Sequence, residues 1–192
     1  FMAKDRWQAG KRFMLGAPPG KIGDEAVDLL QETGASILLL FRSNFEKTNN
    51  IAQDLLNLRD KLARPLIVSV DHETGQVLRD IWFTTVLPGN RALGIIASNF
   101  GLEEAKKYTR EMGLIIASEL RKLGIGWVLA PVLDVLGDFY NPGIALRSFS
   151  NDPEIVSELG KILIETLESK GILSCAKHFP GHGDTTKDSH FH

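Results

Sequence analysis

Short, continuous apolar runs alternate along this chain with stretches that carry apolar residues at helical spacing. Residues 36–41 (Ser-Ile-Leu-Leu-Leu-Phe) and 65–70 (Pro-Leu-Ile-Val-Ser-Val) are two such runs, and an unbroken apolar character is typical of strands covered on both faces. Residues 48–62, which lie between them, repeat leucine or isoleucine every three or four positions and so predict an amphipathic helix. Strand, helix and strand in this order predict parallel strands joined by right-handed crossovers.

The alternation extends over the whole chain. We expect strands at residues 12–16, 36–41, 65–70, 125–135 and 171–177. We expect helices at residues 24–32, 48–62, 102–123 and 153–170. Asn151 and Asp152 are candidates to cap the last helix, and residues 76–100 are expected to be irregular. The pattern predicts an α/β fold, a (β/α)8 TIM-type barrel; a complete one takes about 250 residues, so we expect an incomplete barrel of about five βα units here.

The amino-acid composition is that of an ordinary globular domain and argues against a nucleic-acid-binding or membrane-spanning protein. The chain has 43% hydrophobic and 24% charged residues and a net charge of −2, as in ordinary globular domains. This balance offers no broad attraction to nucleic acid or to an anionic membrane, and no apolar run approaches the ~20 residues of a membrane span. The single cysteine, Cys175, excludes an internal disulfide and is expected in the core. We expect a cytoplasmic protein, with an exported form left open.

The segment 177–190 carries an unusual concentration of reactive side chains. It reads Lys-His-Phe-Pro-Gly-His-Gly-Asp-Thr-Thr-Lys-Asp-Ser-His and directly follows the expected strand at 171–177. Asp188 stands two positions before His190, so an extended backbone would place both side chains on one face. The carboxylate could then orient the imidazole and stabilise its cationic form, which suits general acid and base chemistry.

Other polar residues fall at the same kind of position. Four of them come at the carboxyl ends of expected strands: Asp71, Asp134, Lys177 and His178. Four more come in the loops that follow these strands: Arg79, Arg147, Asp188 and His190. Carboxyl ends of parallel strands meet at one face of a barrel, and that face is where barrel enzymes keep their active sites. We therefore expect these eight side chains to gather around one site.

The segment 177–190 closely resembles the KHFPGHGDTxxDSH signature of family 3 glycoside hydrolases, specifically the NagZ-type β-N-acetylglucosaminidases. Further blocks resemble that family in its own order, and they cover essentially the full chain: residues 66–75, 87–94, 130–135 and 147–153. The resemblance implies that residues 1–192 are the N-terminal part of a single catalytic barrel domain. It also implies a glycosidase that removes terminal non-reducing β-N-acetylglucosamine with retention, in the turnover or recycling of sugars from cell wall or chitin.

The resemblance assigns roles to individual residues. It implies that His190 is the acid/base and Asp188 its partner. It implies that the residues which hold the sugar are Asp71, Arg79, Arg147, Lys177 and His178. It implies a carbohydrate with β-linked N-acetylglucosamine as the binding partner. We expect no cofactor, and no metal because no two histidines form the helical His-Glu-x-x-His motif of zinc hydrolases. The sequence departs from the family where Thr74 replaces a glycine and where Leu136 and Gly137 replace polar residues, which bears on the shape of the sugar pocket.

The family's nucleophile is an aspartate on a later strand, and these 192 residues do not contain a counterpart. We therefore expect a polypeptide of these residues alone to be inactive. Two open sheet edges with apolar faces would also favour its self-association.

Other readings remain open. The protein could be a β-glucosidase-like member of the family or a non-catalytic sugar-binding protein, and the histidines and aspartates of 178–192 are also of the types that bind metals. Arg79 and Arg147 could be simple ion-pair partners of Asp71 or Asp134. We interpret Asp134 as structural, and His182 as a residue that shapes its loop.

Overall fold

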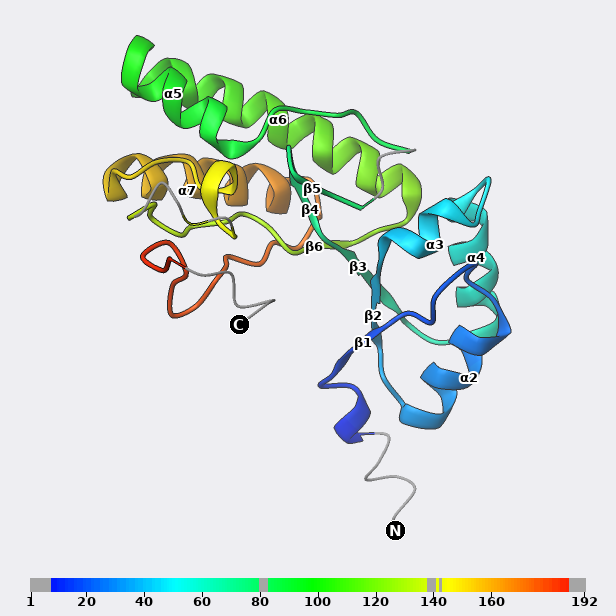
Figure 1. Cartoon of the computed structure of the whole chain (residues 1–192). Coiled ribbons are helices and arrows are strands. Elements are labelled where there is room, and N and C mark those ends of the chain that lie inside the picture. The colour runs from blue at the N-terminus through cyan, green and yellow to red at the C-terminus, as the bar shows by residue number, and fades with distance from the viewer. Residues whose placement is uncertain (1–7, 80–82, 138–140, 142, 187–192) are drawn as a thin grey trace.

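The computed structural model describes residues 8–79, 83–137, 141 and 143–186. Four short strands form its main sheet, and every neighbouring pair is parallel (Figure 1). In spatial order they are β1 (Met14–Gly16), β2 (Ile37–Leu40), β3 (Ile67–Val70) and β6 (Trp127–Val128). The predicted parallel sheet of an incomplete barrel is confirmed, although each of these strands is shorter than its prediction.

Residues 171–177 run parallel to the segment that begins with β6, but they do not form a continuous strand. Two isolated bridges pair Trp127 with Leu173 and Val132 with Lys177. Pro131 lies between the two bridges and has no N–H to donate, which breaks the regular ladder. The expected strand at 125–135 is therefore reduced to two residues, and the expected strand at 171–177 to a chain paired only at intervals.

The inner face of the sheet is less covered than the unbroken apolar runs suggest. On β2, Leu38 and Leu40 are buried against the helices, whereas Ile37 and Leu39 on the opposite face are only half-buried. At the edge of the sheet, Leu173 is 49% exposed and Cys175 is half-buried. The prediction that Cys175 belongs to the core is wrong, because no described strand covers the far side of this segment.

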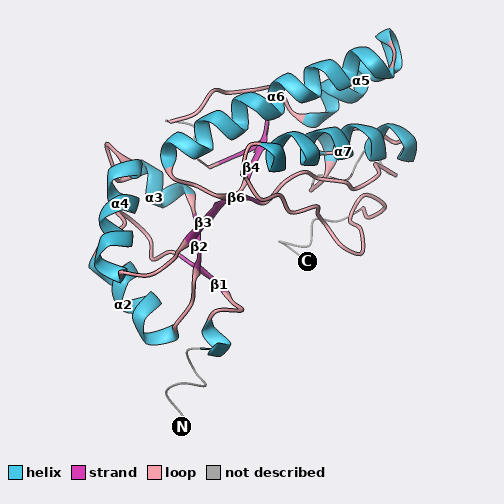
Figure 2. Ribbon diagram, turned by 180° about the vertical axis from the view of Figure 1, so that it is seen from behind, coloured by secondary structure: helices cyan, strands magenta, loops and turns pink. Residues whose placement is uncertain are grey.

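In the described part of the chain, helices α2 to α7 accompany the sheet in two groups (Figure 2). The first group, beside β1 to β3, consists of α2 (Asp24–Thr33), α3 (Arg42–Glu46) and α4 (Ile51–Leu62). The second group consists of α5 (Asn90–Phe100), α6 (Leu102–Leu123) and α7 (Pro153–Ser169), with α6 packed against both of its companions. Asp152 caps α7 as predicted, since its side chain accepts a hydrogen bond from the backbone of Glu154 at 2.9 Å.

Two features differ from the expectation that residues 76–100 are irregular. Helix α5 occupies Asn90–Phe100, and it buries Leu93 and Ala97. Gly94, which argues against a helix by propensity, lies where α5 comes close to the backbone of Phe149. Before it, β4 (His72–Thr74) and β5 (Val77–Leu78) form a small antiparallel hairpin that directly follows β3.

The hairpin begins its turn at Thr74, where the family has glycine. Thr74 has φ 72° and Gly75 has φ 56°, so the threonine adopts the left-handed conformation that glycine reaches more easily. The turn is thus formed with threonine at this position, at the cost of backbone strain. The Thr74 hydroxyl is buried without a hydrogen-bond partner.

No helix in the described part of the chain has both the length and the apolarity needed to cross a membrane.

Candidate functional site

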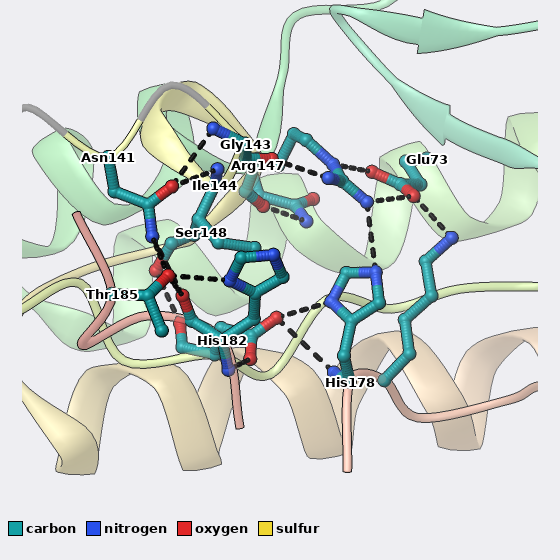
Figure 3. A network of polar contacts seen from close by, with 12 residues as sticks. Glu73, Asn141, Gly143, Ile144, Arg147, Ser148, His178, His182 and Thr185 are labelled. Carbon is teal, nitrogen blue, oxygen red and sulfur yellow. Dashed lines mark hydrogen bonds and ion pairs between the residues drawn. The ribbon is translucent and has the colours of Figure 1, made fainter. Parts of the chain in front are cut away.

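The carboxyl ends of the strands bring together a chain of charged and polar side chains (Figure 3). Asp71 follows β3, Glu73 lies in β4, and Arg147 ends the short 3-10 helix η1 (Ala145–Arg147). Lys177 and His178 come at the end of the irregular fifth strand. The expectation that strand ends gather Asp71, Arg147, Lys177 and His178 is met by these contacts.

Glu73 and Arg147 form the centre of the chain of contacts. Arg147 Nε donates to Glu73 Oε2 at 2.7 Å, and Arg147 Nη2 donates to Glu73 Oε1 at 2.9 Å. The pair is shielded, since the Glu73 side chain is 1% exposed and that of Arg147 is 13% exposed. Burial lowers the pKa of Arg147, but the hydrogen bond and the charge of Glu73 outweigh it, so the net pKa is raised. The ion-pair partner of Arg147 is therefore Glu73, in place of the suggested Asp71 or Asp134.

Lys177 links the same carboxylate to Asp71. Its Nζ donates to Asp71 Oδ1 at 2.9 Å and also forms an ion pair with Glu73 Oε1. Asp71 keeps 23% of its side chain exposed. A carboxylate held by a lysine and open to solvent can accept hydrogen bonds from sugar hydroxyls.

His178 has both ring nitrogens engaged. Nδ1 lies 2.6 Å from Asp134 Oδ2, and Nε2 lies 3.0 Å from Arg147 Nη2. Because a guanidinium can only donate, Nε2 must accept, and Nδ1 must carry the hydrogen that goes to Asp134. His178 is thus held as the neutral Nδ1–H tautomer, and a hydroxyl that donates to Nε2 would compete with Arg147.

Asp134 anchors the loop that follows His178. Its side chain is fully buried, and it also accepts the backbone N–H of His182 at 2.6 Å and that of His178 at 3.2 Å. Burial raises the pKa of Asp134, but the hydrogen bonds from His178 and His182 prevail and lower it overall. These contacts give Asp134 the structural role that we inferred from the sequence.

Asn141 joins two loops beside the site. Its fully buried side chain accepts from the backbone of Gly143 and Ile144 at 2.9 and 3.1 Å. The Nδ2 atom of Asn141 donates to His182 O at 2.7 Å and to Thr185 Oγ1 at 3.0 Å. The His182 ring also contacts Thr185, which agrees with the interpretation that His182 shapes its loop.

Sequence reasoning gave no role to Glu73 or Asn141. The alternation Asp71-His72-Glu73 after a strand is one signal that could have drawn attention to Glu73. Asn141 has no comparable signal, because the partners that join it to the second loop, His182 and Thr185, lie 41 and 44 positions away in the sequence.

Of the remaining predicted residues, the structure describes only Arg79. Arg79 is half-buried just after β5, and the described residues show no contact between it and the network. Asp188 and His190 lie outside the described residues, so their predicted pairing stays a prediction. Among the residues that the structure describes, no group of three or more His, Cys, Asp or Glu side chains is arranged to hold a metal ion.

A hollow of about 610 Å³ opens beside this network. Its walls include Asp134, Lys177, His178, Pro180 and Asp184, which combine polar groups with apolar surface. The size lies in the range of small-molecule pockets. The arrangement offers several hydrogen-bond donors and acceptors at fixed positions, which a ligand rich in hydroxyl groups can use.

Comparisons with known proteins agree on one group of relatives. The sequence model described as "Glycosyl hydrolase family 3 N terminal domain" matches residues 10–192. A protein named "Beta-hexosaminidase" from Neisseria meningitidis is 36% identical over 171 residues, which cover 88% of this chain and 47% of that relative. The chain therefore spans about half the length of the relatives it matches.

Solved structures give the same picture. NagZ from Neisseria gonorrhoeae in complex with N-trifluoroacetyl-D-glucosamine superimposes with a TM-score of 0.82 at 33% identity, over 92% of this chain and 52% of that one. A glycoside hydrolase family 3 β-N-acetylglucosaminidase from Paenibacillus sp. gives a TM-score of 0.85 at 34% identity, over 96% of this chain and 35% of that one.

Proposed function

The chain belongs to glycosyl hydrolase family 3, and on that premise we propose that its protein removes terminal β-linked N-acetylglucosamine from glycans by hydrolysis with retention. The observation that carries the proposal is the contact chain Asp71–Lys177–Glu73–Arg147–His178, which lies at the carboxyl ends of the strands. Relatives named for hexosaminidase activity support the choice of sugar. Residues 1–192 are then the N-terminal part of one catalytic barrel domain, and its proposed location is the cytoplasm.

The described residues supply binding and positioning. Asp71 and Lys177 hold sugar hydroxyls, Arg147 and His178 add further polar groups next to them, and Arg79 is a further donor. Hydroxyl groups bound this way fix the glycosidic bond relative to the catalytic groups, which removes much of the entropic part of the barrier.

Bond cleavage requires two further groups. His190, oriented by Asp188, protonates the departing oxygen and later takes a proton from water, since imidazole titrates near neutral pH. A carboxylate attacks the anomeric carbon to form a covalent intermediate, which is the usual route to retention. We propose that this carboxylate comes from residues beyond these 192, so a polypeptide of residues 1–192 alone is inactive.

The anomer of the first product tests the proposal. Full-length protein is given an aryl N-acetyl-β-glucosaminide in phosphate buffer, and proton NMR follows the product before it mutarotates. The proposal requires β-N-acetylglucosamine first. The α anomer would contradict retention, a sugar phosphate would indicate phosphorolysis, and activity that is lost with chelator and restored by zinc would favour the metal hypothesis.

A polypeptide limited to residues 1–192 is also proposed to self-associate. Leu173 at the sheet edge is 49% exposed and Phe179 is 97% exposed, which leaves apolar surface available for contact. A stable, compact monomer in size-exclusion chromatography would refute the proposed self-association.

A further inference from the structure

The Glu73 carboxylate pairs with both cationic side chains of the site, Arg147 and Lys177. Its Oε1 atom accepts from Arg147 Nη2 and pairs with Lys177, while its Oε2 atom accepts from Arg147 Nε. With only 1% of its side chain exposed, Glu73 has no surface to offer a ligand. It therefore acts on a ligand only through the two cations that it holds.

We propose that Glu73 is a positioning residue: it aims Arg147 at His178 Nε2 and Lys177 at Asp71, and so keeps the sugar-binding groups in one arrangement. Its effect on sugar binding rests on the proposed function, whereas its effect on Arg147 and His178 does not.

The geometry of the arginine supports this assignment. A guanidinium is flat, so the two hydrogen bonds to Glu73 fix the plane and direction of Arg147. Fixing that plane points Nη2 at His178 Nε2, 3.0 Å away. Within the described residues, the Arg147 guanidinium also donates from Nη1 to the Gly143 carbonyl, and one bond at the far end of the fork does not set the plane.

The lysine provides a second, independent constraint. Lys177 lies between Asp71 and Glu73, and its side chain is 14% exposed. With both carboxylates present, the ammonium is held midway and leaves part of Asp71 open to solvent. Without Glu73, Lys177 would turn fully towards Asp71 and occupy the acceptor that the proposed function gives to sugar hydroxyls.

Neutralising Glu73 therefore has a specific consequence. In Glu73→Gln, an amide NH₂ replaces one of the two oxygens to which Arg147 donates, so Arg147 loses at least one of these hydrogen bonds and the negative charge that pairs with it. Arg147 is then free to rotate away from His178. A merely structural carboxylate would change the melting temperature, but it would not change the Arg147–His178 contact selectively.

NMR of full-length protein labelled with ¹⁵N at arginine and histidine tests the assignment, with melting temperatures recorded for every variant. In the native protein, the Arg147 Nε–H signal should be protected from solvent exchange and the His178 signals should show a single neutral tautomer. Glu73→Gln should lose the protection and shift His178 Nε2, and should bind N-acetylglucosamine about tenfold or more weakly. Glu73→Asp, which keeps the negative charge on a shorter side chain, should restore part of the Arg147 protection and part of the affinity.

Asp54→Asn is the matched control. Asp54 is also a buried carboxylate, 8% exposed, and it pairs with Lys21 and Thr48 in another part of the fold. This variant should leave the Arg147 and His178 signals and the affinity unchanged even if it lowers the melting temperature. A protected Arg147 signal and native affinity in Glu73→Gln would overturn the assignment. Native protein that neither binds N-acetylglucosamine nor cleaves its glycosides would refute the proposed function alone, because the NMR signals still decide the role of Glu73.

Discussion

Arg147 and Glu73, which stand 74 positions apart in the sequence, form a shielded ion pair with two parallel hydrogen bonds. The pair joins the 3-10 helix η1 to the hairpin that follows β3. Two segments that each carry a sugar-binding candidate, Arg147 in one and Asp71 next to the other, are thereby fixed relative to one another. The arrangement of the proposed sugar-binding residues thus depends on Glu73, which is too buried to meet a ligand itself.

Acid should weaken the fold through Asp134. Its pKa in the folded protein is lowered, so its ionised form stabilises the fold above the unfolded pKa of about 3.9, and this contribution is lost as the pH falls through the folded pKa. The difference in free energy of unfolding between native protein and Asp134→Asn should be full at about pH 6 and should shrink below about pH 4. Urea unfolding at a series of pH values measures it, and a difference that grows in acid would show that Asp134 is not stabilised as an anion.

Thr74→Gly should stabilise the protein. The change relieves a left-handed threonine, worth about 1–2 kcal/mol, and removes a buried hydroxyl without a partner, worth about 1–3 kcal/mol. It also costs about 1 kcal/mol in chain entropy and about 1 kcal/mol in lost apolar burial. We expect a net gain of about 1 kcal/mol in the free energy of unfolding by denaturant titration. A loss of stability would mean that Thr74 makes contacts that outweigh its strain.

Much of this arrangement can be predicted from the sequence. The apolar runs give the parallel strands, and parallel strands place Asp71, Lys177 and His178 at one edge, because their carboxyl ends coincide. Helix α5 could not be predicted, because Pro88, Gly89 and Gly94 all count against a helix locally, and only packing on Phe149 explains Gly94. The Glu73–Arg147 pair and the Asn141 contacts depend on how distant loops meet, which no local pattern contains.

Gly94→Ala should disturb the site from a distance. A Cβ at Gly94 would lie 1.7 Å from Phe149 O, so α5 and the segment that carries Arg147 must separate. We expect a loss of about 1–3 kcal/mol in the free energy of unfolding and weaker binding of N-acetylglucosamine. Gly126→Ala is the control, because a Cβ there meets nothing within 4 Å. If both substitutions lowered stability and binding equally, the close approach of Gly94 to Phe149 could not be the cause of the loss.

The proposed acid/base pair predicts a dependence on the leaving group. His190→Ala should slow full-length enzyme strongly on poorly activated aryl glycosides and much less on activated ones, because an activated phenolate needs little protonation. Asp188→Asn should give a smaller version of the same pattern, whereas Asp71→Asn should weaken affinity for every leaving group alike. Steady-state kinetics on a series of aryl glycosides measures this. The same loss for His190→Ala across the series would exclude His190 as the first proton donor.

Recognition of N-acetylglucosamine by this site, as proposed, can be tested with two substrates of full-length protein. The ratio of kcat/KM for an aryl N-acetyl-β-glucosaminide to that for the aryl β-glucoside with the same leaving group isolates the sugar, because the aglycone is identical. We expect the N-acetyl substrate to be turned over faster, and Asp71→Asn to lower kcat/KM for it. Faster turnover of the glucoside would refute the proposed function and make the protein a β-glucosidase.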